Sequence, residues 1–148
     1  MENNKSPMSK GVDLIFIAKK IRILGIAIII GMAVVFGFGL TVAGKYVNEE
    51  LAPFGLVSFI ICTAFCLGSF YFRKTMLKNL GGSNFVNKYF NGHVIPFAMC
   101  DFGGLLCVAT NLFVNSNIIY ASAGFFLSVI FMILNFPRND DYEKLKSL

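Results

Sequence analysis

The sequence predicts an all-α integral membrane protein, a four-helix bundle that forms a single transmembrane domain. Three observations predict it. The apolar residues are gathered in four long runs with almost no charge, and nearly all basic residues lie in alternate segments between those runs. The composition agrees, because only 14% of the 148 residues are charged and 56% are hydrophobic, whereas soluble domains carry about 25% charged residues.

Four apolar runs are long enough to cross a bilayer as helices. The hydrocarbon core is about 30 Å thick, so a spanning helix needs roughly 20 apolar residues. The predicted spans are 23–43, 51–72, 94–114 and 118–136. We expect helices because lipid offers no partner to an unpaired backbone group, and no run shows the alternation of apolar and polar residues that is typical of barrel strands.

Three shorter segments flank these spans. Apolar residues precede a basic cluster in 12–22, so this segment is expected to extend the first helix into the cytoplasm or to lie along the membrane surface. Residues 83–90 follow a Gly-Gly pair and have the pattern of a short interfacial helix. Residues 139–148 follow Pro137 and are predicted to form a cytoplasmic tail.

The basic residues predict the orientation of the chain. Of the 13 Lys and Arg residues, all except Lys45 precede the first span, separate the second from the third, or follow the fourth. Positive residues stay on the cytoplasmic side, so both termini are predicted to be cytoplasmic. The spans then form two hairpins joined by a basic inner loop. This distribution accounts for the net charge of +5, so no nucleic-acid partner is predicted. Residue usage suggests a bacterial cytoplasmic (inner) membrane.

Asp101 is the candidate functional residue, because it is the one carboxylic acid inside a predicted span. An ionised Asp at the centre of a membrane helix costs roughly 2.5–3.5 kcal/mol, so it normally faces the bundle interior. Polar or small residues follow it at alternating spacings of three and four, which predicts one packing stripe along the helix. This stripe consists of Asp101, Gly104, Val108, Asn111 and Asn115.

Two interpretations of Asp101 remain open. As a functional group, it would exchange a proton or a cation within the membrane. As a structural group, it would pair with a basic residue near the inner surface, such as Arg22 or Arg73, or with a hydroxyl of a neighbouring helix. The structural interpretation is favoured, because a single acid without a second intramembrane charge is thin support for a transport cycle.

The first span is rich in small residues at helix-packing intervals. Small residues four positions apart allow two helix backbones to approach closely in a membrane. The pairs with this spacing are Ala27/Gly31, Ala33/Gly37 and Gly39/Ala43. They predict close association with another helix, either in this chain or in a partner subunit.

The cysteines and the histidine point to structure more than to chemistry. Cys62, Cys66, Cys100 and Cys107 all lie in apolar spans. Buried free thiols are expected to behave as small hydrophobes, and this interpretation is preferred to a four-thiolate metal site. His93, the only histidine, is expected at the headgroup surface. No metal and no cofactor are therefore predicted.

The sequence contains no paired nucleophile and base, no phosphate-binding glycine loop and no HExxH helix, so catalysis is not expected. The leading functional hypothesis is an accessory, assembly or self-associating subunit of a larger membrane complex. Its partners would be the lipid bilayer and other membrane subunits, or a second copy. The alternative is a small proton- or cation-coupled transporter, or a channel-like oligomer, that uses Asp101. A membrane-anchored regulator acting through the basic inner surface is a third, weaker hypothesis.

Overall fold

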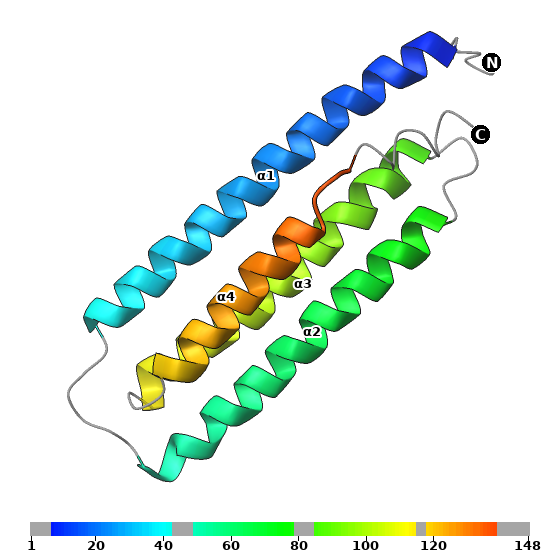
Figure 1. Ribbon diagram of the computed structural model, residues 1–148. Helices are drawn as coiled ribbons and strands as arrows, with labels where there is room; N and C mark the ends of the chain where they lie inside the picture. The colour runs from blue at the N-terminus through cyan, green and yellow to red at the C-terminus, as the bar shows by residue number, and fades with distance from the viewer. Residues whose placement is uncertain (1–6, 43–48, 79–84, 115–117, 139–148) are drawn as a thin grey trace.

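The computed structural model describes residues 7–42, 49–78, 85–114 and 118–138 (Figure 1). These residues form four α-helices and one short 3₁₀ turn, so the all-α, four-helix prediction is confirmed for the described chain. The elements are α1 (Pro7–Val42), the turn Glu49–Leu51, α2 (Ala52–Lys78), α3 (Phe85–Val114) and α4 (Ile118–Leu134).

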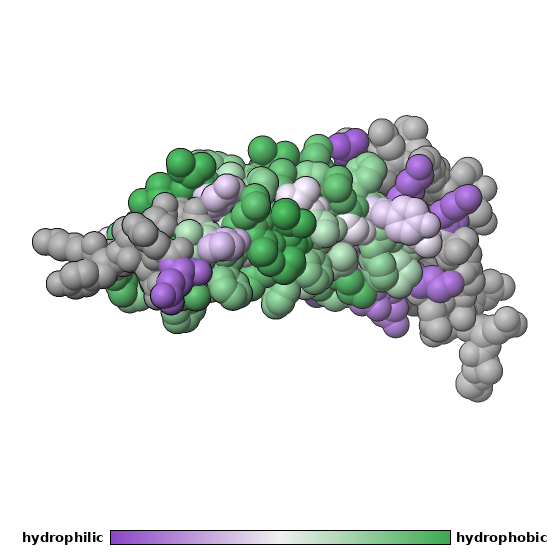
Figure 2. Space-filling model, turned by 90° about the horizontal axis from the view of Figure 1, so that it is seen from below, coloured by the Kyte–Doolittle hydropathy of each residue, from purple (hydrophilic) through white to green (hydrophobic). Residues whose placement is uncertain are grey.

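Three of the helices contain segments long and apolar enough to cross a membrane. These segments are Ile15–Val42, Ala52–Lys78 and Val86–Val114, whereas α4 is a shorter apolar helix of 17 residues. Large apolar side chains cover the outside of the bundle, and Figure 2 shows them as a hydrophobic band with hydrophilic residues near the two ends. Apolar surface on this scale is typical of a protein whose solvent is lipid. The described chain is that of a helical membrane protein.

The helix α3 lies at the centre of the bundle. It packs against α2, α4 and α1, and α2 also contacts α4. Figure 1 shows α1 on one side of the α3–α4 pair and α2 on the other. The first turns of α1 and α3 and the last turns of α2 and α4 share one end of the bundle, so consecutive helices run in opposite directions.

The helix α1 is an outer layer that buries a single stripe. Its buried positions are Ala18, Ile21, Gly25, Met32 and Gly39, which recur at intervals that place them on one side of the helix. Ile28, Ile29 and Phe36 are half-buried beside this stripe. The remaining described side chains of α1 between residues 15 and 42 are mostly exposed.

Two of the flanking segments are continuous with the long helices. Residues 12–22 belong to α1, and residues 85–90 form the first turns of α3 instead of a separate interfacial helix. Tyr89 is fully buried, so this part of α3 packs against protein. A Cβ at Gly92 would lie 3.4 Å from the Cβ of Met76 of α2, so the first turns of α3 approach α2 closely. The predicted tail 139–148 and the turn 115–117 lie outside the described residues.

Candidate functional site

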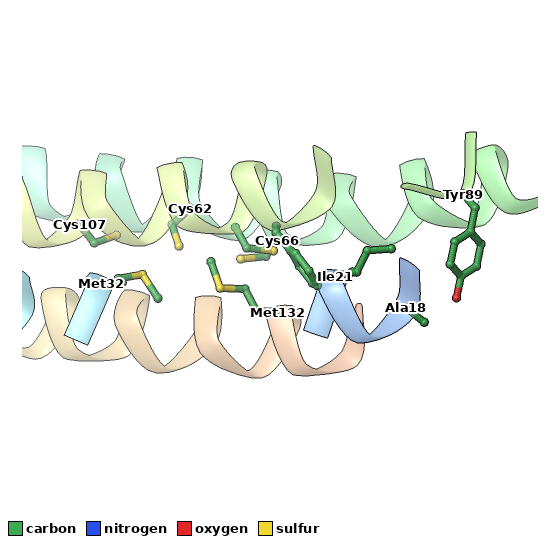
Figure 3. Close-up of a cluster of buried hydrophobic side chains, with 10 residues drawn as sticks. Ala18, Ile21, Met32, Cys62, Cys66, Tyr89, Cys107 and Met132 are labelled. Carbon is green, nitrogen blue, oxygen red and sulfur yellow. The ribbon is translucent and has the colours of Figure 1, made fainter. Parts of the chain in front are cut away.

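The interior of the bundle contains a cluster that we call the cysteine seam: Cys62 and Cys66 of α2, Cys100 and Cys107 of α3, and Ser128 of α4. Figure 3 shows the sulfur atoms of the labelled cysteines following the bundle axis, with those of Met32 and Met132 nearby. All four cysteines are free and buried, as expected from the sequence.

Glycines allow the three helices to meet at this seam. A Cβ at Gly103 would lie 3.1 Å from the Cα of Cys62. A Cβ at Gly124 would lie only 2.6 Å from the Cβ of Cys107. The helices therefore approach at backbone distance, as is typical of small residues at membrane helix contacts.

Weak hydrogen bonds connect the seam across the helices. The hydroxyl of Ser128 lies 3.4 Å from the Cys62 thiol and 3.8 Å from the Cys66 thiol. The Cys62 thiol donates to the Gly124 carbonyl at 3.7 Å. These contacts satisfy polar groups that lipid would leave unpaired. Among the described residues, no group of three or more His, Cys, Asp or Glu side chains is placed to hold a metal ion.

Toward the end of α4 the interior becomes more polar. The hydroxyl of Ser69 lies 3.2 Å from the Cys100 thiol and donates to the Cys66 carbonyl at 2.7 Å. The side-chain amide of Asn135 donates to Ser69 at 3.0 Å. The Oδ1 atom of Asn135 is buried and has no hydrogen-bond partner among the described residues, and the same holds for Asn111 on α3.

Two arginines hold the end of α4. Arg73 is 7% exposed, and it donates to the carbonyls of Leu134 at 3.0 Å and Phe136 at 3.3 Å. Arg22 of α1 donates to the Pro137 carbonyl at 2.9 Å. The last carbonyls of a helix lack intrahelical partners and carry partial negative charge. Arg73 therefore caps the last turn of α4, and Arg22 holds the chain just beyond it from the other side, roles that the sequence did not indicate.

Asp101 lies at the boundary between α1 and α3. The residues about one turn before and one turn after it both face α1. A Cβ at Gly25 of α1 would lie 3.0 Å from Phe97, and Gly104 packs against Met32 of α1. The carboxylate is half-buried. It makes no hydrogen bond or ion pair with any residue in the described ranges, so neither Arg22 nor Arg73 pairs with it there.

The buried face of α3 is turned by about one residue from the predicted stripe. Gly104, Val108 and Asn111 are buried, whereas Asp101 lies at the edge of the face. The centre of this buried face includes Cys100, Gly103 and Cys107, because α2 packs on that side of α3. The sequence placed these three residues beside the stripe. Asn115 lies outside the described residues.

The small residues of α1 fall into two groups. Gly39 is buried, and a Cβ there would meet Val108 at 3.4 Å. Around Gly31 and Gly37, by contrast, a Cβ would have no neighbour within 4 Å. Ala27 and Ala33 are exposed as well. Packing within the described chain therefore uses Gly39 but leaves four of the predicted packing residues on the outer face; Ala43 is not among the described residues.

The prediction of a surface histidine is wrong. His93 is fully buried, its Nδ1 lies 2.9 Å from the Tyr89 carbonyl, and its ring lies 4.6 Å from the Tyr89 ring. No feature of the sequence indicated this burial. The predicted span starts at residue 94, which places His93 beside the headgroups, whereas α3 begins more than two turns earlier, at Phe85, and packs against α2.

No protein-family model, curated protein or solved structure matches the chain. Function is therefore argued from the geometry.

Proposed function

We propose that the protein is a small four-span accessory subunit that associates with another membrane helix, or with a second copy of itself, through the outer face of α1. The observation that carries this proposal is the open space around Gly31, where a Cβ would meet nothing within 4 Å among the described residues; Gly37, about 120° away around the helix, is open in the same way. At other glycines of the bundle, such as Gly103 and Gly124, neighbouring atoms of the same chain occupy the space that a Cβ would need.

The physical argument concerns what glycine does in a membrane helix. A mid-helix glycine costs roughly 0.5–1 kcal/mol relative to alanine, and Gly31 gains no packing in return from the residues that the structure describes. Lipid tails are as apolar as leucine, so helices associate in membranes by close packing over small residues. Ala27 and Gly31 are one turn apart on the same side of α1, and both are exposed. A second helix could approach the α1 backbone closely at these two residues, as neighbouring helices do at Gly103 and Gly124 in the cysteine seam.

The same proposal includes the topology. Lys19, Lys20, Lys74, Lys78 and Lys88 are exposed at the end of the bundle where α1 and α3 begin and α2 and α4 end. This arrangement favours a cytoplasmic location for that end, with α1–α2 and α3–α4 as two successive hairpins in a bacterial inner membrane. The helix α4, although short, runs beside α3 and would be the fourth span.

A pair of substitutions of matched size tests the association. Gly31→Ile adds a branched side chain to the outer face of α1, whereas Ala64→Ile adds one to the exposed side of α2. The proposal predicts a species larger than the single chain after mild-detergent extraction from native membranes; we expect Gly31→Ile to abolish this species and Ala64→Ile to retain it. Identical partner recovery for both variants, with both folded, would contradict the proposal.

Transport through Asp101 is the second candidate function. The observation in its favour is that the carboxylate is half-buried at the α1–α3 boundary and has no hydrogen bond or ion pair within the described residues. An intramembrane acid in such a position can take up and release a proton or a cation. Asp101→Asn in proteoliposomes separates the candidates: lost flux with intact assembly supports transport, and unchanged flux with lost assembly supports a structural role.

A further inference from the structure

The basic residues of the described chain gather at one end of the bundle, where Asp13 of α1 is the one described acid. These basic residues lie on the turns that approach this end: Lys10, Lys19, Lys20, Arg22, Arg73, Lys74, Lys78, Lys88 and Arg138. At the opposite end the described charged residues are Glu49 and Glu50. Positive charge beside a hydrophobic band is complementary to a leaflet of anionic lipid.

Lys19 and Arg22 form the best-defined part of this basic end. They are three residues apart on α1, so they lie on the same side of the helix, and both are exposed. The hydrogen bond from Arg22 Nη2 to the Pro137 carbonyl, 2.9 Å long, fixes the guanidinium at the junction of α1 with the end of α4. A guanidinium has five N–H donors, and this bond uses one of them.

The pair lies near one end of the apolar segment Ile15–Val42. Ile23 and Leu24, which follow Arg22 directly, are exposed apolar residues, and so are Ile15 and Phe16, about one turn before Lys19. Long basic side chains near the end of a span extend toward the membrane surface, so the charged groups of the pair can reach the level of the phospholipid phosphates. Arg presents a planar fork that fits phosphate oxygens, and Lys adds a point charge.

We propose that Lys19 and Arg22 bind the headgroup phosphate of an anionic phospholipid at the junction of α1 and α4. This binding does not depend on the proposed association through the outer face of α1. Zwitterionic lipid is disfavoured at this position, because its own ammonium group would be placed among the basic residues.

Lys20 provides a matched control on the same turn. It carries the same charge at nearly the same depth but points about 100° away from Lys19 around the helix. Its Nζ lies 4.6 Å from the centre of the Phe16 ring, so it is engaged in a cation–π contact. A specific site and a diffuse basic surface therefore predict different results for Lys19 and Lys20.

The test is native mass spectrometry of the full chain in mild detergent with phosphatidylglycerol or phosphatidylcholine. We expect the native chain to prefer phosphatidylglycerol. Lys19→Gln should weaken that binding roughly fivefold, the effect of one charge beside an anionic surface. Lys19→Arg should restore it, and Lys20→Gln should leave most of it intact.

Three results would overturn the proposal. The first is equal binding of the two lipids by the native chain. The second is an equal loss in Lys19→Gln and Lys20→Gln, which would indicate diffuse attraction. The third is release of phosphatidylglycerol by excess inorganic phosphate, which would indicate a site for free phosphate. Because Lys19 is exposed and makes no hydrogen bond or ion pair with the described residues, its substitution leaves the fold available for the measurement.

Discussion

Replacing Gly124 with alanine is expected to destabilise the bundle by separating α4 from α3. The new Cβ would lie 2.5 Å from the Sγ and 2.6 Å from the Cβ of Cys107, where ordinary contact begins at 3.4 Å. A flexible side chain could move aside, but the Cβ of Cys107 is fixed to its backbone. The two helices must therefore move apart by about 1 Å at this point, and the contacts on either side weaken with them.

The size of the effect follows from two opposing terms. Inserting one carbon into a close-packed core costs about 1–3 kcal/mol. Alanine recovers up to about 1 kcal/mol that glycine loses in a helix. The net loss of stability for Gly124→Ala is therefore about 1–2 kcal/mol.

The assay uses the protein's own thiols. Because all four cysteines are buried, their reaction with a maleimide during an SDS titration in mixed micelles reports the opening of the bundle. Gly124→Ala should shift the titration to lower SDS. Gly31→Ala, which places its Cβ in open space, should be neutral or slightly more stable.

A double substitution tests the geometry directly. Gly124→Ala combined with Cys107→Gly moves the Cβ from α3 to α4, so the two changes should partly compensate, with a coupling of about 1 kcal/mol. The reasoning is refuted if Gly124→Ala is as stable as the native chain, because α3 and α4 would then not approach at this distance.

Three further substitutions test other parts of the structure. Arg73→Gln removes charged donors from the end of α4 and should lower the free energy of unfolding in the SDS titration by about 2 kcal/mol or more. Substitution of the exposed neighbour, Lys74→Gln, should change it by less than about 0.5 kcal/mol, and equal effects would contradict the capping role. Ser69→Ala leaves the buried amide of Asn135 without its acceptor and should cost about 1–3 kcal/mol, measured as a lower thermal midpoint by circular dichroism; an unchanged midpoint would count against the bond. Asp101→Asn removes a charge without removing any hydrogen bond of the described residues, so stability should hold or rise; a clear fall would reveal a partner.

The helices were predictable because lipid imposes a simple length and composition rule. The predicted span 51–72 lies in α2 except for Leu51, which belongs to the preceding 3₁₀ turn, and α3 contains 94–114 entirely. The boundaries at the basic end were harder, because charged and apolar residues alternate there and the hydropathy of the sequence falls before the helix ends. Thus α2 continues to Lys78, and α3 starts at Phe85.

The site was only partly predictable. The buried thiols followed from their apolar surroundings, but their convergence depends on which helices are neighbours, and a spacing pattern on one helix does not contain that information. The same limit applies to Arg22 and Arg73. Their charges indicated orientation, whereas their contacts with carbonyls at and just beyond the end of α4 depend on that end lying between α1 and α2. For Asp101, the sequence predicted a half-polar stripe but not its place at the edge of the face.

The arrangement of α1 has a consequence for biogenesis. The helix α1 lies against α3 and α4, on the opposite side of that pair from α2. During synthesis, the two helices that leave the ribosome first therefore have no extensive surface to share in the bilayer. Both helices pack mainly against α3, so the buried stripe of α1 stays exposed until the second half of the chain has been inserted. For that interval the outer and the inner faces of α1 are both open to other proteins of the membrane. If α1 associates with another helix as proposed, that contact can form before the bundle closes.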